Sequence, residues 1–347
     1  MQQPSRGPEV SAPVQPIRVV AIGGGTGLST LLRGLRKHVT APGQAATAPG
    51  AIGDLAAVVT VTDDGGSSGR LRKDFNMLPP GDLRNCMVAL SQEEAMLSRL
   101  FAYRFRSGDG LEGHNFGNLF VAALTDITGD FGQAIQLASK ILATRGRIYP
   151  VTTANTTLVA RMGDGSLVRG ETNITASSLR IAELMLDPPD AAPLPETLAA
   201  IEQADLITVG PGSLYTSLIT NLLVQGMPSA LANAKGVRVY VCNLMTQANE
   251  SLGLSASEHI ARIFEHTHAR IFDYALVNTA PFSTEILARY AAQNASPIEA
   301  DIERIEALGV HCITGDFANE ESLVRHAPDS VTDTLLALGR AAVARRE

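Results

Sequence analysis

Hydrophobic and polar positions change in blocks along this chain, and each block has the length of one strand or one helix. Residues 19–22, VVAI, are a short β-branched run without a polar residue, which predicts a buried strand. After the glycine-rich residues 23–27, four leucines recur at helical spacing and predict the buried face of a helix: Leu28, Leu31, Leu32 and Leu35. The first pattern is therefore a strand, a glycine turn and a helix.

Similar blocks continue along the chain and predict further elements. A D-G turn at Asp164-Gly165, between two short apolar runs, is typical of a β-hairpin. The other expected elements are strands at residues 55–62, 206–209, 237–242 and 274–277, a mainly helical stretch at about 82–143, and an amphipathic helix from residue 331.

Strands that alternate with helices favour a parallel sheet covered by helices. The predicted fold class is therefore α/β, a Rossmann-like parallel sheet with a helical and β-hairpin section inserted at about residues 82–180. We expect residues 17–347 to form a single domain, because the alternation continues across the proline-rich residues 188–195. Residues 1–16 are polar and proline-rich, which predicts a disordered lead-in.

Charge and composition exclude several classes of protein. The net charge of −7 argues against a general nucleic-acid binder, whose affinity needs excess lysine and arginine. The three cysteines are widely spaced without a C-x-x-C pair, so neither a disulfide scaffold nor a zinc site is indicated. No apolar stretch approaches the ~18 residues of a membrane span, and no hydrophobic signal core precedes the first strand. We expect a cytoplasmic protein, and a homodimer suits this fold.

Two glycine-rich turns are candidate phosphate sites, because each joins a predicted strand to a helix N-terminus with free backbone N–H groups. The residues are Gly24, Gly25, Thr26 and Gly27 in the first turn, and Gly212, Ser213 and Thr216 in the second. The alternative is a tight turn without a ligand. The first turn lacks the third glycine of G-x-G-x-x-G, since Leu28 stands in its place.

Asp63 and Asp64 follow the second predicted strand, where a carboxylate can bind a ribose or a divalent cation. Asp64 is the candidate Mg²⁺ ligand; the alternative for both is a solvated turn. Ser67, Ser68 and Arg70 come next and could close on a diphosphate, because hydroxyls and a guanidinium bind phosphate oxygens. The alternative for this segment is an exposed charge run.

Neutral polar residues complete the candidate site. Asn243 follows the strand at 237–242 and is expected to recognise a sugar or a nucleobase, with Thr246 and Gln247 nearby. Asp82 is a candidate N-cap, which places Asn85 in a first helical turn that faces ligand or solvent. His114 is a candidate acid–base group, although a histidine without a visible carboxylate partner is more often structural.

Other motifs argue against known classes of enzyme. No G-x-x-x-x-G-K-[ST] or G-x-S-x-G occurs, which counts against a P-loop ATPase and a serine hydrolase. Three histidines in one predicted helix are interpreted as a surface cluster rather than a metal site: His259, His266 and His268.

The motif blocks together resemble one family. They are GGGTGLS (23–29), TDDGGSSGRLR (62–72), LPPGDLRNC (78–86), YRF (103–105), GHNFGN (113–118), GPGSLYTS (210–217) and VCNLMTQ (241–247). In this order they are similar to the bacterial gluconeogenesis factors, a UDP-sugar-binding family within the CofD-like 2-phospho-L-lactate transferase superfamily. Asn115-Phe116 depart from the Ser-Leu of the family pattern, which weakens a specific role for Asn115.

The resemblance implies a Rossmann-like protein that binds UDP-N-acetylglucosamine or UDP-glucose. Such a protein would support cell shape and envelope growth on gluconeogenic carbon sources, together with cell-envelope or metabolic enzymes and without a catalytic step of its own. The alternative is a transferase that uses Mg²⁺ to move a phospholactyl-type group from a nucleotide diphosphate donor to an acceptor. A third reading, an NAD-dependent dehydrogenase, rests on fold analogy alone.

Overall fold

The computed structural model describes residues 15–40, 50–92 and 96–346. The predicted lead-in, residues 1–16, lies outside this description except for its last two positions. Among the described residues, none of the helices combines the length and the apolar composition that a membrane span requires.

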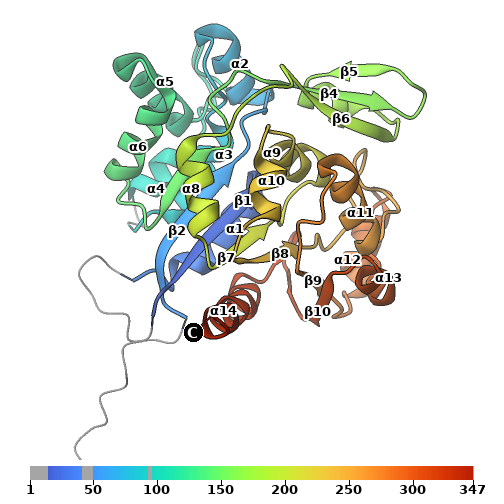
Figure 1. Ribbon diagram of the computed structural model, residues 1–347. Helices are drawn as coiled ribbons and strands as arrows, with labels where there is room; N and C mark the ends of the chain where they lie inside the picture. The colour runs from blue at the N-terminus through green and yellow to red at the C-terminus, as the bar shows by residue number, and fades with distance from the viewer. Residues whose placement is uncertain (1–14, 41–49, 93–95, 347) are drawn as a thin grey trace, which may run out of the picture.

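A seven-stranded parallel sheet forms the centre of the described structure (Figure 1), in the order β10-β9-β8-β7-β1-β2-β3. The expected α/β class is confirmed. The strands are β1 (Ile17–Gly23), β2 (Ile52–Val59), β3 (Arg147–Pro150), β7 (Leu206–Val209), β8 (Val237–Val241), β9 (Tyr274–Asn278) and β10 (His311–Gly315).

The first strand and helix form as the hydrophobic pattern predicts. The side chains of β1 are buried except at Arg18, and α1 (Gly25–Arg36) buries the four leucines that recur at helical spacing. Parallel strands pair with both edges of β1, and its side chains are buried on both faces of the sheet, which explains the run without polar alternation.

The remaining helices surround the sheet. These helices are α2 (Gly66–Phe75), α3 (Gly81–Leu90), α4 (Met96–Ala102), α5 (Phe116–Thr128), α6 (Phe131–Ile141), α7 (Glu171–Ala176), α8 (Pro195–Gln203), the π-helix η1 (Leu214–Ile219), α9 (Thr220–Leu222), α10 (Met227–Ala232), α11 (Ala256–Thr267), α12 (Thr284–Ala291), α13 (Ile302–Ala307) and α14 (Pro328–Ala344). Helix α14 packs against α1 and, in the view of Figure 1, lies at the opposite end of the sheet from α2.

Two small antiparallel sheets are added to this core. The predicted hairpin is confirmed as β4 (Thr157–Met162) and β5 (Leu167–Arg169), and β6 (Ile181–Asp187) pairs with β4. This sheet stands above α11 in Figure 1. The second sheet is the hairpin of β11 (Ala318–Glu320) and β12 (Val324–His326).

Three sequence predictions need correction at the level of single elements. Strand β2 covers Ile52–Val59 rather than residues 55–62, because Val61 and Thr62 are buried in the segment after the paired strand. Helix α14 begins at Pro328 rather than at residue 331. The N-cap of α3 is Pro80, so Asp82 lies inside the first turn of that helix.

The order of the strands determines where a ligand can bind. From β1 the chain moves outward through β2 to β3, and β7 then starts the other half of the sheet on the opposite side of β1. Neighbouring loops diverge at such a switch point, at the carboxyl ends of the strands. The glycine turns after β1 and β7 meet at this switch point.

Candidate functional site

A cavity of about 330 Å³ opens at the switch point. It is lined by the turn after β1, the turn after β7, the loop after β8, and the hairpin of β11 and β12. The lining residues are Thr26, Gly27, Thr30, Pro211, Gly212, Asn243, Leu244, Met245, Thr246, Gln247, Tyr290, Leu323, Val324, Arg325 and His326. The predicted residues Thr26, Gly27, Gly212 and Asn243 are therefore brought together.

The N-terminus of α1 faces this cavity. Gly24 is the N-cap and has no side chain with which to cap the helix. The N–H groups of Thr26 and Gly27 make no hydrogen bond within the part of the chain that the structure describes. Unpaired N–H groups at the positive end of a helix dipole attract an anion. The first glycine turn thus has the geometry of a phosphate site.

The two glycine turns touch at Gly27. A methyl group added at Gly27 would lie 2.4 Å from the carbonyl oxygen of Pro211, closer than any real contact. The adjacent Gly212 N–H donates to Asn243 Oδ1 at 3.2 Å. Asn243 therefore holds the second turn in place while its amide remains on the cavity wall.

The second helix N-terminus is already capped by a carboxyl group of the protein. Glu250 accepts hydrogen bonds from the Tyr215 N–H at 3.2 Å and from Thr216 Oγ1 at 2.8 Å, next to the start of η1. Burial raises the pKa of Glu250, and these hydrogen bonds oppose the rise. Thr216 is buried and hydrogen-bonded to this carboxyl group, so no ligand phosphate is needed to accept the hydrogen bonds at this helix end.

We expect Glu250→Ala to destabilise the protein by about 1–2 kcal/mol, because buried donors on Tyr215 and Thr216 lose their acceptor. Urea unfolding monitored by circular dichroism measures the loss. Glu202→Ala on the exposed face of α8 is the matched control and should change stability by less than about 0.5 kcal/mol. Equal effects of the two substitutions would contradict the internal cap.

Three carboxyl groups gather beside the first glycine turn, on the β2 side. The carboxylate of Asp82 accepts a hydrogen bond from the Gly25 N–H, and burial followed by the charge of Asp63 raises the pKa of Asp82 to about 6. Burial raises the pKa of Glu171 to about 9, with further contributions from Asp63, Asp82 and Glu250. Thr62 Oγ1 donates to Glu171 at 3.2 Å. Glu171 is therefore protonated at neutral pH.

Asp64 has a different environment. Its Oδ1 accepts hydrogen bonds from the backbone N–H of Thr172 at 2.8 Å and from Thr172 Oγ1 at 2.6 Å, at the start of α7. Asp63 accepts from the Gly65 N–H at 2.9 Å. No group of three or more metal-ligating side chains occurs among the residues the structure describes. Mg²⁺ binding by Asp64 stays a prediction.

The remaining predicted residues lie around α2 and α3, except for Ser213, and none of them lines the cavity. The hydroxyl of Ser67 lies 3.1 Å from His114 Nδ1, and Asn118 Nδ2 donates to Ser68 Oγ at 3.5 Å. Both serines are buried. Arg70 donates to the carbonyl oxygen of Glu112 at 2.8 Å. Asn85 contacts the carboxylate of Asp82, while Ser213 directly precedes η1.

His114 and two histidines of α11 make hydrogen bonds within the fold. Burial, with the charge of Arg70, lowers the pKa of His114. His259 is fully buried, which corrects the expected surface cluster, and its ring bonds the Ser255 carbonyl oxygen at 2.8 Å. His266 Nε2 accepts from the Leu184 N–H at 3.0 Å.

The sequence analysis missed the hairpin side of the cavity. Arg325 is an exposed cation on its wall, and His326 contacts the Cys242 carbonyl oxygen through Nε2 at 2.9 Å. Burial lowers the pKa of His326 to about 4, so this ring is neutral and presents Nδ1 as an acceptor. Tyr290 also lines the cavity. No motif signals these residues, because they follow the last recognisable block by more than forty positions.

Comparison with known proteins gives consistent matches over most of the chain. The family described as "2-phospho-L-lactate transferase CofD" matches residues 19–318. A protein of Halalkalibacterium halodurans named "Gluconeogenesis factor" is 44% identical over 92% of this chain and 95% of its own length. The protein of the same name from Bacillus subtilis is 42% identical over 92% of this chain and 98% of its own length.

A solved structure matches as well. A crystal structure of a Bacillus halodurans protein superposes with a TM-score of 0.87 at 43% sequence identity. The match covers 93% of this chain and all of that one. The parallel sheet and its additions are therefore shared with an experimentally determined fold.

Proposed function

Because the chain belongs to the family of the bacterial gluconeogenesis factors, within the group described as 2-phospho-L-lactate transferase CofD, we propose that it binds a nucleotide diphosphate sugar. The proposed ligands are UDP-N-acetylglucosamine and UDP-glucose. One observation carries the proposal: the unpaired N–H groups of Thr26 and Gly27 face a cavity at the switch point of a parallel sheet.

The cavity walls suit the parts of such a ligand. The diphosphate would accept from the N–H groups of Thr26 and Gly27 and from the Arg325 guanidinium. Asn243 and Gln247 offer amide groups to a sugar or a base. Gly24 and Gly25 shape the turn, and Asp63, whose charge acts on the neighbouring Asp82, has a carboxylate that can accept from a ribose hydroxyl.

We propose a regulatory rather than a catalytic role for this binding. A protein that reports the supply of a UDP-sugar would link carbon metabolism to cell-envelope growth and cell shape on gluconeogenic carbon sources. Its partners would be envelope or metabolic enzymes, and its compartment the cytoplasm. A homodimer is part of the same proposal.

Calorimetric titration tests the proposed ligand. The purified protein is titrated with UDP-N-acetylglucosamine, UDP-glucose, GDP and NAD, with and without Mg²⁺, and the bound ligand is recovered and analysed. Selective binding of a UDP-sugar that is recovered intact supports a sensor. Absence of UDP-sugar binding contradicts the proposal.

Arg325→Ala should weaken UDP-N-acetylglucosamine binding by about tenfold, because it removes one charge-assisted hydrogen bond to the diphosphate. Arg325 is the only lysine or arginine among the described residues that line this cavity. Arg99→Ala, an exposed arginine on α4, serves as the charge-matched control and should leave affinity within about twofold. Calorimetry measures both, and an unchanged affinity in Arg325→Ala removes the hairpin from the site.

A second candidate function is a Mg²⁺-dependent transferase. Two observations favour it, the match to the CofD family and the carboxyl groups of Asp63 and Asp82 on the β2 side of the first glycine turn. The donor oxygens of Asp63 and Asp82, with Asp64 in the same segment, are the type that Mg²⁺ prefers. The ion would neutralise charge on a phosphate group. Loss of bound nucleotide that requires both Mg²⁺ and an acceptor would favour this candidate over the sensor.

A further inference from the structure

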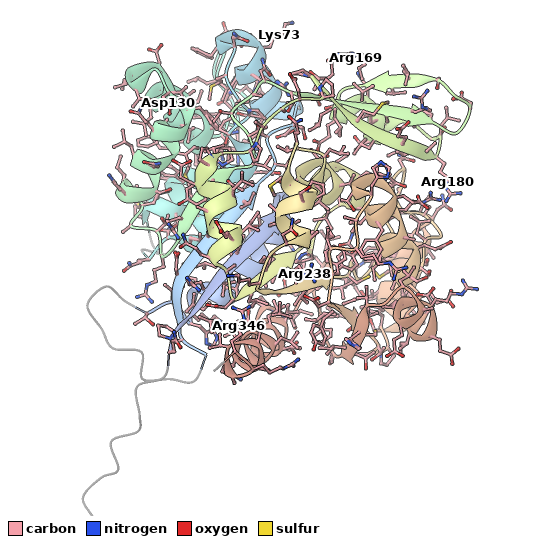
Figure 2. The ribbon with its side chains drawn as sticks, viewed as in Figure 1. Lys73, Asp130, Arg169, Arg180, Arg238 and Arg346 are labelled. Carbon is pink, nitrogen blue, oxygen red and sulfur yellow. The ribbon has the colours of Figure 1, made fainter. Side chains whose placement is uncertain are left out.

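A second cavity, of about 470 Å³, lies at the opposite end of the strands. It is formed where β8, β9 and β10 begin and where α14 ends. Its lining includes Lys235 before β8, Arg238 in β8, His311 at the start of β10, and Arg345 and Arg346 after α14. Figure 2 shows Arg238 and Arg346 in the same lower part of the molecule, near α14.

The cavity concentrates positive charge in a chain whose net charge is −7. Four lysine and arginine side chains line it, and Asp273 is the only acidic residue among its lining residues. Arg238 forms a close ion pair with Asp273 at 2.6 Å, and Arg346 pairs with Asp205 at 3.3 Å. These pairs hold the walls together.

Two of the cations have no such pair. Lys235 and Arg345 are exposed, and neither makes an ion pair within the described part of the chain. Basic residues after a helix are often explained by the negative end of the helix dipole. Arg345 follows the end of α14, and Lys235 lies between the end of α10 and the start of β8. The positively charged side chains therefore come from separate elements and line one cavity.

We propose that this cavity binds a small polyanion that carries two or more phosphate groups. The size of the hollow suits a small molecule, and cations spread over separate elements suit a ligand with more than one anionic group. Arg345 offers planar donors to phosphate oxygens, and Lys235 adds a point charge.

The proposed anion site is distinct from the cavity at the switch point, because the two open at opposite ends of the parallel strands. Both can be occupied at once. Helix α14, whose C-terminal end borders the anion site, packs against α1 near Gly34, in the last turn of α1.

Calorimetric titration with sodium pyrophosphate at low ionic strength tests the site, because salt screens exposed charges. Lys235→Ala and Arg345→Ala should each weaken pyrophosphate binding by about fivefold, and the double variant by about twentyfold or more. Arg180→Ala is the matched control. It removes one exposed arginine at the far edge of the molecule in Figure 2 and should leave binding within about twofold.

A second titration separates this site from the first. With UDP-N-acetylglucosamine present in excess, wild-type protein should still bind pyrophosphate, and Arg325→Ala should bind it as wild type does. Complete loss of pyrophosphate binding in excess UDP-sugar, unchanged binding in the double variant under the same conditions, or absence of pyrophosphate binding overturns the proposal. Thermal unfolding of each variant verifies that it is folded. If the UDP-sugar does not bind, the proposed function fails, but the pyrophosphate titrations of wild type and of the Lys235 and Arg345 variants still test this cavity.

Discussion

Gly27→Ala is expected to destabilise the protein by about 2–3 kcal/mol and to abolish most of its UDP-sugar affinity. The added methyl group would lie 2.4 Å from the Pro211 carbonyl oxygen, 2.7 Å from its carbonyl carbon and 3.0 Å from the Gly212 nitrogen. All three atoms belong to backbone, so no side chain can rotate away. The two glycine turns must separate, and the N–H groups of Thr26 and Gly27 then lose their position in the cavity.

Urea unfolding and calorimetry on the same preparation measure both effects of Gly27→Ala. Gly163→Ala is the control, since the nearest atom to its added methyl group is the Arg180 carbonyl oxygen at 3.6 Å, an ordinary contact. The control should keep wild-type affinity and lose less than about 1 kcal/mol. A Gly27→Ala protein with wild-type stability and affinity would show that the turns are not closely packed.

Stability should fall by roughly 2–3 kcal/mol as the pH rises from 6 to 8, because Glu171 holds a proton in the folded state. Its pKa is about 9 when folded, against an ordinary value near 4.5. Between these values the unfolded chain binds fewer protons than the folded one. Raising the pH therefore favours unfolding across this window, and the effect ends above the folded pKa.

Glu171→Gln should remove this part of the pH dependence, because the amide stays neutral at every pH. The variant is expected to be as stable as wild type near pH 5 and more stable than wild type at pH 8. Urea midpoints at three pH values measure the slope, and Glu303→Gln on exposed α13 serves as the control with the wild-type slope. Parallel slopes in wild type and Glu171→Gln would show that this carboxyl group is ionised in the folded protein.

Much of the fold could be predicted from local patterns. Strand β7 has the predicted bounds, and the leucines of α1 are buried as their spacing requires. The end of β2 could not be predicted, because Val61 and Thr62 are as buried as the strand itself. Burial without backbone pairing leaves the same hydrophobic signal as a strand, so periodicity cannot separate the two.

The candidate site could be predicted only where its residues lie in glycine-rich blocks. Thr26, Gly27 and Gly212 were found because strand, turn and helix follow each other directly. Arg325 was missed, since the hairpin that carries it reaches the cavity only through the fold.

The polar residues of the other blocks show a second limit of the sequence. Ser67 was expected on a phosphate, and in the structure it meets His114 from a segment about fifty positions away. A hydroxyl that binds a ligand and one that joins two segments of the fold look alike in sequence. The same holds for Thr216, whose acceptor is the carboxylate of Glu250.

A crystal structure of the protein with UDP-N-acetylglucosamine tests the central claim most directly. The account predicts diphosphate oxygens at about 3 Å from the backbone nitrogens of Thr26 and Gly27, with Arg325 on the same group. The sugar or base should contact Asn243. A ligand bound away from the N-terminus of α1, or a cavity that stays without ligand at saturating concentration, would contradict it.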